Sequence, residues 1–176
     1  RATPRARGEA IGEAQAEMLL RAAARLEARF ASLDTSVQSA QLACCQHFVE
    51  TLGGQTPGLH EELTGMARSA GVGIETLAQL NLLGDSPLGA AAEDPAILGT
   101  STLIHASGDG GVVMAGAGLG GVLGSGLTMT THDEEGRSVA LLRGPGGLGW
   151  VGVNDAGLAL MAAHPRWSSV EERVPA

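Results

Sequence analysis

The chain has 176 residues, which is enough for one domain with a substantial apolar core. Its net charge of −8 argues against nucleic acid or an anionic membrane surface as the main partner. It has no tyrosine, two phenylalanines and two tryptophans, so the core must be built from aliphatic residues, alanine and methionine. No basic segment followed by an apolar run opens the sequence, and no apolar run approaches about 18 residues, so we expect a cytoplasmic protein.

The first half of the chain is rich in helix-forming residues, and its apolar residues recur at helical spacing. Helices are predicted over residues 8–31, 36–52, 57–70 and 75–83. We expect Gly53 and Gly54 to end the second helix. Pro57 suits the first position of the third helix, and Gly71 suits its end.

The pattern changes after residue 98, where short apolar runs alternate with turn residues rich in glycine. Strands are predicted over residues 102–106, 112–117, 127–131, 138–142, 148–153 and 158–162. Helices followed by an antiparallel meander indicate an α+β domain. We divide it into a helical part (1–83), an exposed linker (84–98), a strand meander (99–163) and a tail (164–176).

A glycine followed by hydroxyl residues, Gly99-Thr100-Ser101-Thr102, stands at the head of the first predicted strand. Glycine relieves steric constraint at a scissile bond, and the Thr100 hydroxyl can attack the carbonyl before it. After cleavage the freed amine of Thr100 can serve as the base. A self-processing hydrolase is one interpretation of this run, and a plain turn that leads into a strand is the other.

Three further groups have both a chemical and a structural interpretation. Cys44 and Cys45 are adjacent in a predicted helix and are either reactive thiols or small core residues. Glu61 and Glu62 are either an acid/base pair or, since adjacent helix residues do not face each other, a solvated face or helix-terminus charges. His105 is either a functional histidine close to Thr100 or an ordinary strand residue.

Neither a metal nor a cofactor is expected. The five histidines and two cysteines do not have the spacing of metal ligands. Residues 116–121 match the pattern Gly-x-Gly-x-x-Gly, but neither a helical pattern nor a suitably spaced acidic residue follows. We therefore reject a dinucleotide site there.

Three stretches, in this order, resemble one family, the acyl-coenzyme A:6-aminopenicillanate acyltransferase-like N-terminal nucleophile hydrolases (peptidase family C45). The first is residues 3–8 with Gly12, which is similar to an opening Pro-x-x-Arg-Gly … Gly. The second runs from Pro57 to Asn81 and matches the family at Glu62, Gly65, Ala67, Gly71, Val72, Leu77 and Asn81. The third is residues 145–158, which resembles Pro-Gly … Gly-x-Asn-x-x-Gly-Leu.

The resemblance implies a four-layer αββα sandwich, made as a precursor and cut before a cysteine in a Gly-Cys run. Thr100 stands at the position of that cysteine, which makes Gly99–Thr100 the processing site and Thr100 the nucleophile. Asn154 stands where the family has an asparagine that holds the oxyanion. Ser101 and Thr102 are supporting residues in this interpretation, and the substrate is a small-molecule amide or acyl compound.

The sequence departs from the family in three ways that leave alternatives open. Threonine replaces cysteine at Thr100, and residues 115–121 lack the aspartate that usually follows an aromatic residue on the second strand. The family's domain also continues past the equivalent of Ala176, so we expect a C-terminal half or a second processed chain to complete a heterodimer. The alternatives are a nucleophile on a chain that starts after Ala176, and a catalytically degenerate scaffold or binding subunit.

Overall fold

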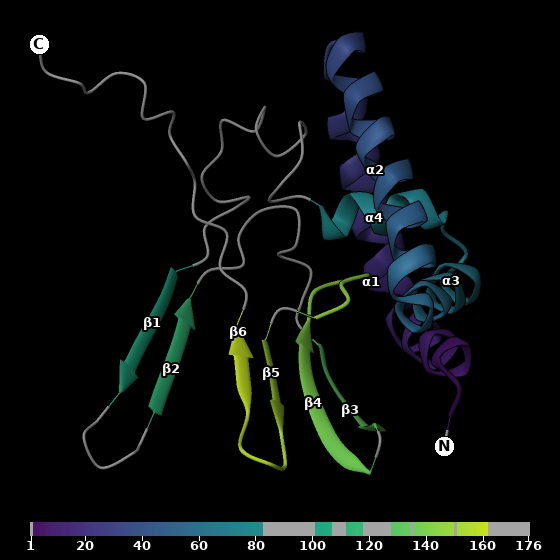
Figure 1. Cartoon of the computed structure of the whole chain (residues 1–176). Coiled ribbons are helices and arrows are strands. Elements are labelled where there is room, and N and C mark those ends of the chain that lie inside the picture. Colours follow the sequence, from purple (N-terminus) through teal and green to yellow (C-terminus); the bar gives the residue numbers. More distant parts are fainter. Residues whose placement is uncertain are drawn as a thin grey trace, which may run out of the picture.

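The structure, a computed structural model, describes residues 2–82, 101–106, 112–117, 128–134, 136–149 and 151–161 (Figure 1). Four helices come first, and six antiparallel strands follow. This arrangement confirms the predicted α+β class. The predicted linker (84–98), the tail (164–176), and the residues Gly99 and Thr100 lie outside the described residues.

The helices lie close to their predicted positions. They are α1 (Pro4–Ala31), α2 (Thr35–Gln55), α3 (Pro57–Ala70) and α4 (Ile74–Asn81). Helix α1 begins four residues earlier than predicted because Thr3 caps it, with its Oγ1 accepting a hydrogen bond from the Ala6 N–H at 3.2 Å. As predicted, Pro57 occupies the first turn of α3 and Gly71 ends it in the left-handed conformation, with φ of 71°.

The predicted end of α2 at Gly53 and Gly54 is wrong, because the helix continues through both glycines to Gln55. The break comes from Pro57, whose ring disfavours helical geometry in the residue before it. Thr56 accordingly has φ of −136° and ψ of 66°. Proline, rather than glycine, therefore separates the second and third helices.

Three glycines let α1 and α3 approach until their backbones touch. A Cβ atom added to Gly8 would lie 1.9 Å from the carbonyl oxygen of Glu62, and one added to Gly12 would lie 2.4 Å from that of Met66. On α3, a Cβ added to Gly65 would lie 2.3 Å from the carbonyl oxygen of Arg5. No larger residue fits at these three positions without separating the helices.

In the part of the chain that the structure describes, the apolar core is shared by all four helices and contains no aromatic residue among its fully buried members. Its buried residues are Ile11, Leu19, Ala22, Leu26, Leu52, Leu63, Met66, Ala67, Ala70, Leu77 and Leu80. None of the helices in the described part of the chain is long and apolar enough to cross a membrane.

The strands form two antiparallel sheets that are not hydrogen-bonded to each other in the described residues. One is a hairpin of β1 (Ser101–Ala106) and β2 (Val112–Ala117). The other is a meander of β3 (Thr128–Glu134), β4 (Arg137–Arg143), β5 (Val151–Asn154) and β6 (Ala159–Met161). Figure 1 shows β3 and β4 nearest the helices and the β1–β2 hairpin on the far side of the meander.

The hairpin between β3 and β4 is tighter than predicted. We expected its turn to span residues 132–137, but Glu134 pairs with Arg137, which leaves a loop of two residues. Gly136 in this loop has φ of 84°. A glycine with positive φ gives a two-residue loop the twist that matches the flanking strands, and the strands therefore extend further.

Candidate functional site

The predicted nucleophile run lies at the start of β1. Ser101 and Thr102 are the first residues of this strand and pair with Ala117 and Gly116 of β2. The strand predicted over residues 102–106 is therefore present, and it begins one residue earlier. Gly99 and Thr100 themselves lie outside the described residues.

Asn154 is the last residue of β5 and begins the turn into β6. Its Oδ1 accepts hydrogen bonds from the backbone N–H groups of Ala156, at 3.1 Å, and Leu158, at 2.9 Å. Gly157, with φ of 82°, closes the turn by donating its N–H to the Asn154 carbonyl at 3.1 Å. These bonds fix which side of the amide is oxygen and leave Nδ2 as a donor without a partner among the described residues.

Asp155 attaches the same turn to β4. Its Oδ2 accepts a hydrogen bond from the Ser138 N–H at 3.0 Å, and its own N–H donates to the Ser138 carbonyl at 3.1 Å. The Asn154 amide is therefore held on a turn that two hydrogen bonds of Asp155 attach to β4, which suits a fixed hydrogen-bond donor.

The described residues do not bring Asn154 next to the start of β1. The two belong to different sheets, and Figure 1 shows the β1–β2 hairpin standing apart from β5 and β6. The predicted oxyanion donor and the predicted supporting residues Ser101 and Thr102 are therefore not assembled into one site here.

What the structure does assemble is a buried ion-pair cluster of Arg7, Glu62 and Arg143. The Arg7 Nε donates to Glu62 Oε2 at 2.6 Å, and the Arg143 Nη1 donates to Glu62 Oε1 at 2.6 Å. The side chains of Glu62 and Arg143 are each 1% exposed and that of Arg7 is 16% exposed. Arg143 also donates its Nε to the Thr130 hydroxyl at 2.9 Å.

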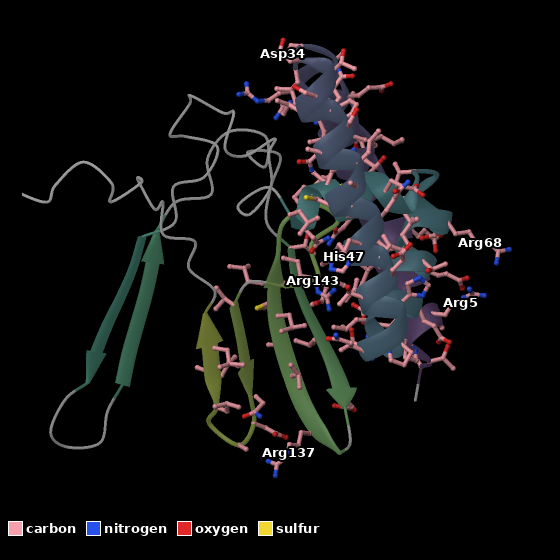
Figure 2. The ribbon with its side chains drawn as sticks, turned by 45° about the horizontal axis from the view of Figure 1, so that its top comes forward. Arg5, Asp34, His47, Arg68, Arg137 and Arg143 are labelled. Atoms are coloured by element: carbon pink, nitrogen blue, oxygen red, sulfur yellow. The ribbon has the colours of Figure 1, made fainter. Side chains whose placement is uncertain are left out.

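This cluster joins the helices to the sheet. Arg7 comes from α1, Glu62 from α3 and Arg143 from the end of β4, and Figure 2 shows Arg143 between the sheet and the helices. Charges with this little exposure are tolerated because each carboxylate oxygen accepts a short, charge-assisted hydrogen bond. Removing one partner would leave the others buried without compensation.

The cluster corrects one expectation and was missed by the sequence analysis. Glu61 is exposed, but Glu62 is buried between two arginines and is not part of a solvated face. A signal was available, because Glu62 precedes Met66 by four residues and therefore lies on the same face of α3, which is apolar. A charge at such a position must have a buried partner.

Asn81 makes a second connection between helices and sheet. Its Nδ2 donates to the carbonyls of Leu77, at 2.8 Å, and Gly146, at 2.9 Å, and its Oδ1 accepts from the Leu148 N–H at 2.9 Å. The loop that follows β4 is thereby fixed on the end of α4. Gly146, with φ of 71°, packs so closely on Leu77 that a Cβ there would lie 2.7 Å from its side chain.

The three stretches that resemble the acyltransferase family therefore meet in space. The Arg7-Gly8 pair of the first stretch contacts Glu62 of the second through both side chain and backbone. Asn81, at the end of the second stretch, bonds to the start of the third. In the described residues these matches serve the packing of helices on sheet, whereas the Asn154 amide keeps its Nδ2 without a partner.

The two cysteines differ in environment. Cys45 is fully buried, and burial raises the pKa of its thiol to about 11. The Gln41 side chain donates to its sulfur at 3.6 Å. Cys45 is therefore a core residue and a poor nucleophile, as one of the two interpretations held, whereas Cys44 is partly exposed.

No group of three or more histidine, cysteine, aspartate or glutamate side chains that could hold a metal ion occurs in the part of the chain that the structure describes. No protein-family model matches the sequence, and no curated protein is significantly similar to it.

Proposed function

We propose that this chain is a self-processing amide-bond hydrolase or acyltransferase whose nucleophile is Thr100. In this proposal the precursor is cut between Gly99 and Thr100, and the mature fold is a four-layer αββα sandwich. A further segment of the precursor, or a second processed chain, completes that sandwich. The substrate is a small molecule with an amide or acyl group.

The observation that carries the proposal is the contact between the three resembling stretches. They are separated by dozens of residues, yet Arg7, Glu62, Asn81 and Gly146 join them by direct hydrogen bonds. If the three matches were unrelated, their residues would not be expected to bond to one another. The contacts between the three stretches therefore support the family interpretation.

Exposed apolar side chains on the meander support a missing second layer. Met129 is 71% exposed and Val153 is 49% exposed. Strand register puts both on the sheet face opposite the one that carries Arg143. An uncovered apolar sheet face is the expected result when a sandwich lacks its second sheet.

The chemistry begins with the chain's own peptide bond. The Thr100 hydroxyl attacks the Gly99 carbonyl carbon and the C–N bond breaks, which frees the Thr100 amine and leaves Gly99 as an ester on the Thr100 oxygen. Water then hydrolyses this ester, which releases the Gly99 carboxylate and regenerates the Thr100 hydroxyl. In turnover that amine takes the hydroxyl proton while the oxygen attacks the substrate carbonyl. The proton goes to the leaving amine, and water or an acceptor amine then releases the acyl group from Thr100.

Asn154 stabilises the oxyanion in this scheme. Its Nδ2 is the free donor of a side chain whose oxygen is already bound by the turn. The Asn154→Asp variant keeps an oxygen acceptor for the Ala156 and Leu158 N–H groups but loses the donor. We therefore expect it to fold normally and to react about 10²–10³-fold more slowly.

The test is acylation by p-nitrophenyl acetate, followed by mass spectrometry of the modified peptide. We expect acetylation on Thr100, no acetylation of a Thr100→Ala variant and slow acetylation of Asn154→Asp. The Asn154→Ala variant is the control for turn damage, because it loses the acceptor as well and should also melt at a lower temperature. Equal rates in wild type and Asn154→Asp, or acetylation at another residue, would overturn the assignment.

A further inference from the structure

A groove runs between helix α1 and the edge of the four-stranded sheet. It has a volume of about 640 Å³, within the range of ligand-binding clefts. Its helix wall is a stripe of small side chains at four-residue spacing, Ala6, Ala10 and Ala14. The alanines leave space between helix and sheet that larger residues would have filled.

The other wall of the groove is the edge of β3. Four consecutive residues, Thr128 to Thr131, line it. Since successive side chains of a strand point to opposite faces, consecutive lining residues mean that the groove follows the strand's edge and not one face. β3 is the first strand in the order of its sheet and pairs only with β4 among the described residues. Alternate residues of such an edge direct unpaired N–H and C=O groups outward.

Gln15 of α1 also lines this groove and is only 2% exposed. Neither its Nε2 nor its Oε1 has a hydrogen-bond partner among the described residues. A buried amide with both groups unsatisfied is costly, so it points to a ligand that supplies one acceptor and one donor. A peptide unit offers both.

One end of the groove is acidic. Asp133 is exposed and lines the groove, and its carboxylate makes no ion pair with a described residue. Arg7 also lines the groove, but its Nε donates to Glu62 and not to Asp133. A basic side chain on the ligand would complement this charge.

We infer that the groove binds an extended peptide segment of another polypeptide, which pairs with the free edge of β3 and bonds to the Gln15 amide through its backbone. Its side chains on one face fill the space that the alanine stripe leaves, and a basic residue lies near Asp133. Strand addition to a sheet edge takes its affinity from main-chain hydrogen bonds and its selectivity from the neighbouring side chains. The inference does not depend on the proposed function.

The binding test uses amide NMR of the whole chain titrated with two peptides, Ac-Lys-Ala-Val-Ala-Val-Ala-NH2 and its reversed sequence. We expect shifts in the β3 amides and in the Gln15 side-chain NH2 signals, and tighter binding by the peptide whose lysine reaches Asp133. Two versions of that peptide, N-methylated at one or the other set of alternate residues, test strand pairing. Only one set should abolish binding, because only one set faces β3. Equal binding by both versions, or shifts confined to other parts of the chain, would overturn the inference.

A second measurement does not depend on the peptide sequence. If the Gln15 amide is kept for a ligand, Gln15→Leu should raise the melting temperature of the free protein by about 2–4 °C and weaken peptide binding at least tenfold. Gln41→Leu is the matched control, since Gln41 is another buried glutamine but bonds to Cys45 and lies outside the groove. It should leave peptide binding unchanged. A lower melting temperature for Gln15→Leu, with peptide binding unaffected, would show that Gln15 is structural.

Discussion

The carboxylate of Glu62 holds two arginines at a point where three elements meet. Because Glu62 and Arg143 are both almost fully buried, their attraction must offset a large desolvation cost. An apolar trio could fill the same space, but it would not require one alignment of α1, α3 and β4. We interpret the cluster as a set of contacts that specifies this alignment. A buried ion pair can have this role even where it adds little to stability.

At the residue scale, the buried thiol of Cys45 predicts a loss of stability at alkaline pH. Its pKa is raised from 9.0 to about 11, so between these values the unfolded chain loses a proton that the folded chain retains. The free energy of unfolding should therefore fall as pH rises from about 9 to 11, by up to about 2 kcal/mol. Below pH 9 the effect is absent. The chain has no tyrosine and no lysine, which are the other residue types whose ordinary pKa lies near this window.

Urea unfolding from pH 8 to 11 measures this slope. Cys45→Ala should be less stable at pH 8, because a buried sulfur is removed, but its stability should decline less between pH 9 and 11. Cys44→Ser is the control and should keep the slope of the wild type. An unchanged slope in Cys45→Ala would contradict the assignment of the titration to that thiol.

At the scale of elements, the contact between α1 and α3 depends on glycine. In Gly8→Ala the new methyl group would meet the Glu62 carbonyl at 1.9 Å, so the helices must separate and the bond from Arg7 to Glu62 must lengthen. We expect a loss of about 3 kcal/mol or more in the free energy of unfolding.

Gly54→Ala is the matched control, since Gly54 lies in α2 with nothing within 4 Å of an added Cβ. It should stabilise the protein by about 0.5–1 kcal/mol. Chemical denaturation of both variants checks this, and similar effects from the two would contradict the packing role.

Local patterns were enough to predict the elements themselves. Apolar spacing and turn glycines predicted four helices and six strands, because both signals act within a few residues. The errors lie at ends, where a competing local rule decided the outcome. Pro57 set the end of α2 in place of Gly53 and Gly54, and Gly136 allowed β3 and β4 to extend beyond their predicted limits.

At the scale of the whole molecule, the contacts that join helices to sheet could not be predicted. Glu62 and Arg143 are separated by 81 residues in sequence. Periodicity places Glu62 on a buried face but does not identify its partner. The same holds for Asn81, whose bonds to Gly146 and Leu148 depend on where the sheet lies. For the candidate site, the sequence predicted a strand from Thr102, one residue after its observed start at Ser101, and the turn at Asn154. Their assembly into one site remains a prediction.

The state of the bond between Gly99 and Thr100 tests the proposed function most directly. The measurement is intact mass with N-terminal sequencing of the full precursor, purified alongside its Thr100→Ala variant. We predict that the wild type contains a chain beginning at Thr100 and that the variant remains uncut at this bond. An uncut bond in the wild type, or a cut only after Ala176, would contradict Thr100 as the nucleophile. The first of these results would favour a scaffold with this fold, and the second would move the nucleophile to the chain that follows.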